Sequence, residues 1–328
     1  MKILVTGGTG FIGSNRNLRR ACLHAGRKVV LSSRLNAGMM RWLAGLGWFL
    51  VCVAIFWQPL RSLFGLAVHS DDASHILLIP LISGWLLYLN RKEIQVVIAY
   101  DFVAAASFLL PAILLKLFAT YSSSLSSGER LTVNVLAFLF FLLAGYASLL
   151  GRATVRKTWF ALAFLLFAVP LPEALLNRLI YGLQAGSAAV AEALFDLSGV
   201  PVLREGFIFR LPRISIEVAQ ECSGIRSSMA LIILAVLLSH FSFRPFWKKV
   251  VFVAAGLLMM LIKNGIRIAA LTLLANYVDP SFLYGPLHHR GGVVFFLFGL
   301  GLLVPLYWWL RRGESGVGKQ TSALTPAR

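Results

Sequence analysis

The sequence predicts an all-α polytopic membrane protein with about eight transmembrane helices and a small periplasmic cap. Of its 328 residues, 58% are hydrophobic and only 13% are charged, whereas soluble proteins average about 45–50% apolar and about 25% charged residues. Long apolar runs such as Val251–Ile262 and Val293–Val304 indicate membrane spans. Basic residues recur in every second loop between these runs, as the positive-inside rule requires. This composition excludes a disordered chain, a disulfide-rich secreted module and a typical cytosolic enzyme.

The net charge of +18 comes from 31 Lys and Arg against 13 Asp and Glu. In a soluble protein such an excess suggests nucleic acid, but here basic residues flank spans that exclude acids, so we expect no nucleic-acid partner. The three cysteines, Cys22, Cys52 and Cys222, are widely spaced. They suggest neither a disulfide framework nor a zinc site, and we expect no metal or cofactor.

Residues 1–38 differ from the rest of the chain. Gly7, Gly10 and Gly13 follow a short strand-like run with a spacing that resembles extended short-chain dehydrogenases. A working dinucleotide site needs a complete βαβ unit and an acidic residue, yet residues 1–41 contain no Asp or Glu. We therefore expect a truncated Rossmann-like remnant or a mis-assigned start, with Met39 or Met40 as the natural initiator. Residues 39–312 form the predicted transmembrane domain, and 313–328 a flexible cytoplasmic tail.

Apolar segments long enough to approach the roughly 20 residues that cross a bilayer define the predicted spans. They lie near 42–60, 73–89, 98–119, 131–150, 157–171, 225–242, 247–277 and 291–310. The basic loops put both termini in the cytoplasm and the alternate loops on the outer, periplasmic side. The longest outer stretch is 172–224. Within it, Leu175–Leu197 predicts an amphipathic helix at the interface, and Val200–Val218 predicts a short hairpin or irregular cap.

Three polar clusters interrupt the apolar background: Glu221–Ser228, Asn264–Arg267 and His288–Gly292. Arg267 lies seventeen residues beyond Val250, or about 25 Å along a helix, which is most of the way across a core of about 30 Å. The other two clusters stand at outer ends of spans. All three are therefore predicted at one membrane face and at similar depth.

These residue types permit acyl transfer. A cysteine thiolate attacks a carbonyl to form a thioester, a nearby cation or a helix N-terminus favours the thiolate, a histidine moves protons, and an arginine stabilises the oxyanion. Each residue also has a structural interpretation: Cys222 as small apolar packing, Arg267 as an interface snorkeller, and the histidines as headgroup anchors. Ionisable residues inside a membrane are nevertheless functional candidates by default, and the coincidence of three clusters favours a site.

The chain resembles the exosortases, the bacterial counterparts of archaeosortases. The resemblance covers about residues 40–312 and is carried by residues 170–228, by NGIRIAALTLLANY, by the histidine before the last span, and by Asp72–His75 with the following LLIPLISGWLLYL. It implies a helical bundle with sortase-like cysteine protease or transpeptidase activity.

The resemblance also implies roles for individual residues. Cys222 is the acyl-thioester nucleophile and Arg267 is the essential arginine, assigned as proton donor; because a guanidinium does not titrate at ordinary pH, we interpret it as an oxyanion and leaving-group donor. His288 is the preferred third residue, because its spacing puts it one turn before the last span, and His289 is the alternate. His75 matches a Ser-His near the second span, where a structural role is equally compatible.

The implied partners are exported proteins with a C-terminal sorting signal: a Pro-Glu-Pro-type motif, an apolar helix and a basic tail. The helix would dock among the spans within membrane lipid, and the motif would emerge beside Cys222. Its glutamate is predicted to pair with Arg204, Arg226 or Arg290. Two other functions are compatible with a multi-spanning chain: a lipid-linked polysaccharide ligase or glycosyltransferase, and a transporter. A transporter would place its polar residues at the midplane in inverted repeats, and the sequence shows no repeat.

Overall fold

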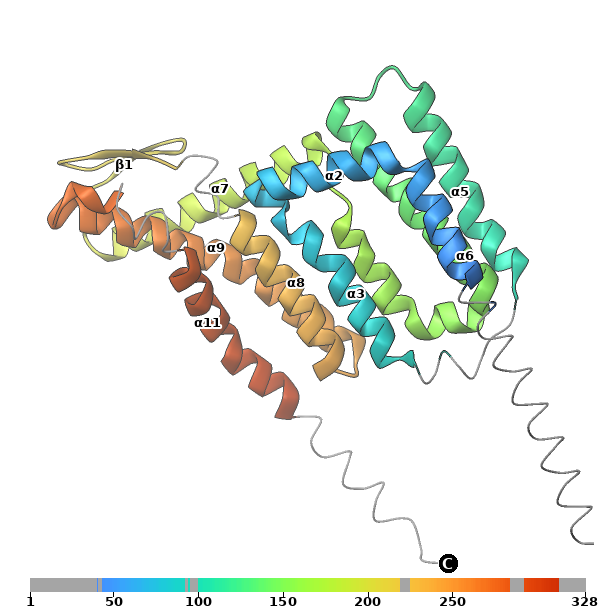
Figure 1. Ribbon diagram of the computed structural model, residues 1–328. Helices are drawn as coiled ribbons and strands as arrows, with labels where there is room; N and C mark the ends of the chain where they lie inside the picture. The colour runs from blue at the N-terminus through green and yellow to red at the C-terminus, as the bar shows by residue number, and fades with distance from the viewer. Residues whose placement is uncertain are drawn as a thin grey trace, which may run out of the picture.

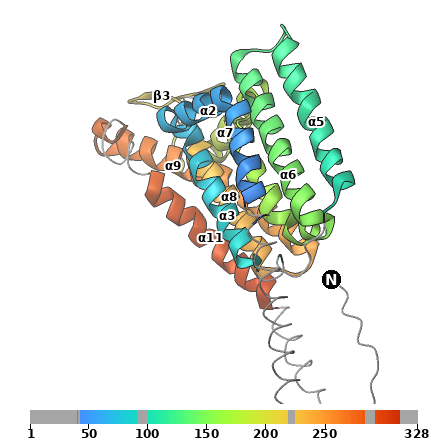
Figure 2. The same ribbon diagram turned by 45° about the vertical axis from the view of Figure 1, so that its right-hand side comes forward.

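The computed structural model describes residues 43–91, 100–218, 225–283 and 292–312, together with the single positions 40 and 94. Helices make up most of this part of the chain, which confirms the predicted helical class. Figures 1 and 2 show α5 (Phe102–Tyr121) and α11 (Gly292–Arg312) at opposite edges of the bundle, with a small sheet at one end. The predicted segments 1–38 and 313–328 lie outside the described residues, so their expected character stays a prediction.

The first predicted span is bent rather than straight. Leu43–Ile55 is followed by α2 (Trp57–His69), and the two helices meet at 78°. Phe56 between them leaves the helical region, with φ −108° and ψ 18°. Its fully buried ring packs edge-on against Phe138 and Phe141. Burial of this aromatic ring holds the bend in place, and α2 consequently runs across the bundle (Figure 1).

The second predicted span consists of η1 (Asp71–Leu77), a 3₁₀ helix, which leads directly into α3 (Leu78–Leu89). The next helix, α5, packs along α6 (Ser127–Phe164). Ser126 begins α6 with a capping box, in which its hydroxyl accepts from the Glu129 amide and the Glu129 carboxylate accepts from the Ser126 amide. This reciprocal pair satisfies two amides that a helix N-terminus otherwise leaves open.

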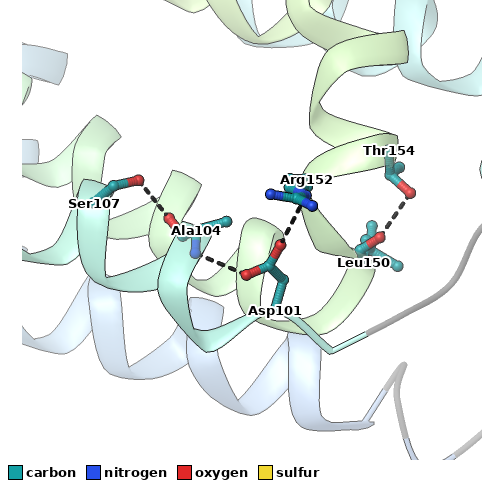
Figure 3. Close-up of polar contacts among 6 residues, drawn as sticks. All are labelled: Asp101, Ala104, Ser107, Leu150, Arg152 and Thr154. Atoms are coloured by element: carbon teal, nitrogen blue, oxygen red, sulfur yellow. Dashed lines mark hydrogen bonds and ion pairs between the residues drawn. The ribbon is translucent and has the colours of Figure 1, made fainter.

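Gly151 divides α6 into two arms. Its torsions, φ 74° and ψ 163°, belong to a region that is essentially open to glycine alone. The two arms correspond to the predicted spans 131–150 and 157–171, and they run in different directions in Figure 1. Beside the break, Asp101 caps α5 by accepting from the Ala104 amide at 2.9 Å, and its carboxylate lies 3.8 Å from Arg152 Nε (Figure 3). The predicted basic loop is thus a single-residue turn followed at once by helix.

After η2 (Leu165–Ala168), α7 (Glu173–Leu197) leads into a three-stranded antiparallel sheet in the order β1-β2-β3. The strands are β1 (Leu203–Glu205), β2 (Ile208–Arg210) and β3 (Ser215–Glu217). This meander confirms the hairpin, one of the two structures predicted over Val200–Val218, and its place as a periplasmic cap stays a prediction. Its central residue, Phe209, is fully buried against Phe195 of α7 and Ile268, so the sheet covers the far ends of α7 and α9.

The last part of the described chain is built around α9 (Phe246–Tyr277), which packs against α7, α8 (Ile225–Ser242) and α11. The short η4 (Pro280–Leu283) packs back on the end of α9. Aromatic rings from α9 and its neighbours close this core, with Phe243, Phe252 and Tyr307 in mutual contact. The central position of α9 makes it the element through which α7, α8 and α11 are held together.

The protein is a multi-pass membrane protein. Four described helices are long and apolar enough to cross a bilayer: Phe102–Tyr121, Ser127–Ala168, Phe246–Tyr277 and Val293–Arg312, or five spans if the bent first pair is counted as one. Ala73–Leu89 and Ser227–Ser242 are shorter apolar helices. Only 17% of the apolar window is buried in Phe102–Tyr121 and in Val293–Arg312, which suits helices at the edges that face lipid. The predicted number of eight spans is not established by these lengths.

Candidate functional site

Polar side chains gather on α9 where it passes between α7 and α8. Lys263, Asn264 and Arg267 share one side of α9 in the middle of its apolar run, because residues three and four apart are neighbours on a helix surface. Lys263 and Asn264 are each 2% exposed, and Arg267 is half-buried. Polar groups buried to this degree require partners, and the neighbouring helices provide them.

Each of the two buried side chains binds a different neighbour. The Lys263 ammonium donates a hydrogen bond to the hydroxyl of Ser227 on α8. The Asn264 amide donates to the hydroxyl of Ser187 on α7, with 3.1 Å between Nδ2 and Oγ. Arg267, one turn beyond Lys263, also makes a polar contact. The predicted Asn264–Arg267 cluster is therefore the crossing point of three helices.

Gly265 makes this crossing possible. A Cβ at this position would lie 2.5 Å from Cβ and Cγ1 of Val190 and 3.0 Å from the carbonyl oxygen of Ser187. Gly186 lies one turn before Val190 on α7, and a Cβ at this position would lie 2.9 Å from the side chain of Leu261 on α9. Small residues thus let α7 and α9 approach closely, and the Asn264–Ser187 hydrogen bond depends on that approach.

Cys222 lies in 219–224, outside the described residues, but both ends of that segment are held by buried side chains. Gln184 of α7 donates a hydrogen bond to the carbonyl of Val218, the last described residue before the segment. At the other end α8 begins at Ile225, and its first turn includes Ser227, which receives the Lys263 hydrogen bond. The described residues that flank 219–224 therefore contact α7 at Val218 and α9 at Ser227.

His75 lies in η1 and is half-buried. η1 packs against α2 and α8, and both Ser74 and His75 make polar contacts. Because α9 also packs against α8, the elements that carry His75 and Arg267 are both neighbours of the helix that follows Cys222. The role predicted for His75 is compatible with this placement and stays a prediction.

Arg204 is already engaged within the protein. Its guanidinium pairs with the carboxylate of Glu192 on α7 at 2.5 Å, and its Nε donates to the carbonyl of Gly206 at 2.9 Å. The ion pair fastens β1 to α7, and the hydrogen bond to Gly206 holds the guanidinium against the turn that follows β1. A glutamate of a bound substrate would have to compete with Glu192 for this arginine.

The other predicted site residues lie outside the described part of the chain. These are Cys222, His288, His289 and Arg290, together with the side chain of Arg226, whose backbone forms part of the first turn of α8. Their predicted roles stay predictions.

Sequence reasoning missed Lys263, Gln184 and Ser187. The signal for Lys263 was present, since a lysine within the apolar run MMLIKNGIRI is as costly as the arginine that was singled out. Gln184 and Ser187 are three residues apart on α7, a helical spacing that places two polar residues on one face. Their partners, Val218 and Asn264, are distant in sequence and follow only from the packing of α7 on α9.

The comparison with protein families gives a match. The family model for the transmembrane exosortases matches residues 67–305, which is nearly three quarters of the chain and includes every predicted site residue. No curated protein and no solved structure matches significantly.

Proposed function

Since the chain belongs to the transmembrane exosortase family, we propose that it is a membrane cysteine protease or transpeptidase acting on exported proteins. The observation that carries the proposal is the family match across Cys222 and Arg267, combined with a buried polar crossing beside the two ends of the Cys222 segment. A cysteine that only fills space within an apolar helix would not need buried polar side chains near it.

In the proposed reaction the Cys222 thiolate attacks the carbonyl of the scissile peptide bond of the sorting signal. The C–N bond breaks, the departing amine takes a proton, and a thioester remains on Cys222 until an acceptor nucleophile or water resolves it. Arg267 donates hydrogen bonds to the oxyanion and the leaving group. His288, or His289 in its place, transfers the proton.

The substrate we propose carries a Pro-Glu-Pro-type motif, an apolar helix and a basic tail. The tail would stay in the cytoplasm, the helix would lie in lipid against the bundle, and the motif would reach Cys222 at the periplasmic face of the bacterial inner membrane. Arg226, Arg290 and His75 are candidate contacts for the motif, and Arg204 is a fourth in competition with Glu192.

Eight spans with both termini cytoplasmic are part of the same proposal. The break at Gly151 supports counting the two arms of α6 separately. The bent first pair, α5, α9 and α11 add four apolar crossings, and the shorter helices Ala73–Leu89 and Ser227–Ser242 add two. With the two arms of α6 this gives eight within the described residues. The three-stranded sheet would then be the periplasmic cap.

The test is co-expression of the full chain with an exported protein that ends in the tripartite signal and carries an epitope tag. Cys222→Ala and Arg267→Ala are expected to leave the substrate at its full length, while the wild-type chain shortens it. Cys52→Ala is the matched control, because Cys52 is fully buried in an apolar helix. Mass analysis of the new C-terminus separates transfer from hydrolysis. Processing by Cys222→Ala at the wild-type level would reject the proposal and favour a ligase or a transporter.

A further inference from the structure

An apolar cavity of about 300 Å³ lies between the two arms of α6. Its lining residues come from 136–143 in the first arm, from 155–166 in the second arm and η2, and from Phe108 of α5. Every lining side chain is apolar, apart from the indole nitrogen of Trp159. Trp159 and Leu166 are 58% and 54% exposed, so the cavity opens at the surface of the bundle, which within the bilayer faces lipid.

Two arginines stand on the same face of the second arm as this lining. Residues three and four apart are neighbours on a helix, and Arg152, Arg156, Trp159 and Ala163 follow that spacing. Trp159 and Ala163 line the cavity. Both arginines are exposed, and 84% of the Arg152 side chain is accessible. One face of the arm therefore begins with two positive charges and continues as a wall of the cavity.

The charges at this end of the cavity favour an anion. The Asp101 carboxylate, which caps α5, lies 3.8 Å from Arg152 Nε (Figure 3). An exposed pair at this distance is weak, so a second anion can compete for Arg152. Lys157 follows Arg156 in the sequence and adds a third positive charge. Residues 100–109 and 150–157 thus hold three basic groups and one acidic group.

The dimensions suit one acyl chain below a headgroup. Val155 and Leu166 are eleven residues apart, or about 16 Å along a helix, which is close to half of a hydrocarbon core of about 30 Å. Arg152 stands three residues before Val155, or about 5 Å further out, where a long charged side chain reaches the headgroups. The apolar helix of the proposed substrate fits this place less well, because its basic tail would meet two arginines.

We propose that an anionic phospholipid binds here, with one acyl chain between the two arms of α6 and its phosphate on Arg152 and Arg156. Guanidinium groups bind phosphate through paired hydrogen bonds, and basic pockets between transmembrane helices bind anionic headgroups. The bound chain fills the space between the arms, so it stabilises the folded hairpin. The inference is independent of the proposed function, because it involves neither Cys222 nor the sorting signal.

The first measurement is native mass spectrometry of the full chain in detergent, titrated with phosphatidylglycerol or with phosphatidylcholine of the same acyl chains. We expect phosphatidylglycerol to bind more tightly. Arg152→Gln combined with Arg156→Gln should weaken its binding about thirty-fold and leave phosphatidylcholine binding unchanged. The matched control is Arg311→Gln with Arg312→Gln, an exposed pair at the end of α11, which should keep the parent affinity.

The second measurement locates the acyl chain. Phosphatidylglycerol brominated on its acyl chains should quench the fluorescence of Trp159, read as the difference between the parent chain and Trp159→Phe. Ala163→Phe places a ring in the cavity without removing a buried side chain, since Ala163 is exposed, and should reduce this quenching severalfold. Ala153→Phe alters an exposed residue of the same arm outside the lining and should leave it unchanged. Size-exclusion chromatography verifies that each variant is folded.

Equal binding of the two lipids would overturn the inference, because it would show only the ordinary lipid contact of a membrane protein. Parent-like affinity after loss of Arg152 and Arg156, or an equal loss in the α11 control, would do the same. Unchanged quenching in folded Ala163→Phe would place the acyl chain elsewhere. Displacement of phosphatidylglycerol by a protein that carries the apolar helix and basic tail would assign the cavity to the substrate instead.

Discussion

Replacing Gly265 by alanine should drive α7 and α9 apart. The new Cβ would lie 2.5 Å from Val190 Cβ and Cγ1 and 3.0 Å from the Ser187 carbonyl oxygen. The Ser187 oxygen is backbone, and Val190 Cβ is fixed to its own backbone, so neither moves without a shift of α7. Overpacking of this kind costs about 1–3 kcal/mol. Alanine offsets up to about 1 kcal/mol of this through its higher helix propensity.

We therefore expect a net loss of about 1–2 kcal/mol from Gly265→Ala. The matched control is Gly182→Ala on α7, where nothing lies within 4 Å of the added Cβ, and which should be neutral or slightly stabilising. Thermal unfolding of both variants in the same detergent measures the difference. Separation of the helices also lengthens the Asn264–Ser187 hydrogen bond, so substrate processing should fall with stability. A Gly265→Ala protein as stable as Gly182→Ala would refute the close packing of α7 on α9.

Two further predictions concern the Arg204–Glu192 ion pair and the buried hydroxyl of Ser228. Arg204→Ala and Glu192→Ala should each weaken the attachment of β1 to α7, and a double-mutant cycle on thermal stability should give a coupling of about 0.5 kcal/mol, because the two side chains are 24% and 43% exposed. A coupling of zero would show that the ion pair does not hold the sheet. Ser228→Ala should leave stability unchanged or raise it, since the buried Ser228 hydroxyl has no hydrogen-bond partner within the described residues. Unfolding at lower temperature would contradict this, and lost processing without lost stability would indicate a substrate contact.

The helices were predictable because apolar runs of span length have few other uses in a sequence. The hairpin within Val200–Val218 was also predictable, from β-branched residues between glycine and proline. The bend at Phe56 was not, because it depends on burial of that ring against Phe138 and Phe141, residues distant in sequence. The break at Gly151 left a signal, the basic residues that follow it, but they predicted a loop where helix resumes at once.

For the candidate site, the sequence singled out Arg267 and the segment around Cys222, whose roles stay predictions, but it did not single out the buried contacts made by Gln184 and Lys263. The Gln184–Val218 and Lys263–Ser227 contacts join residues that are thirty or more positions apart, and no local pattern encodes such pairs. Gly265 was noted only as part of a motif, whereas its role is steric and requires the position of α7. Periodicity reveals which residues share a helix face, but partners across helices follow from packing.

Gly151 has a consequence for the membrane topology of everything that follows it. Ser127–Ala168 spans 42 residues, so an unbroken helix would be about 63 Å long, or roughly twice the hydrocarbon thickness of a bilayer. The turn at Gly151 divides this long helix into a helical hairpin. Each arm of the hairpin approaches the length that is needed to cross a bilayer. A side chain with a Cβ would oppose this backbone conformation. In the proposed eight-span topology, the parity of the crossings that follow α6 thus depends on a single glycine.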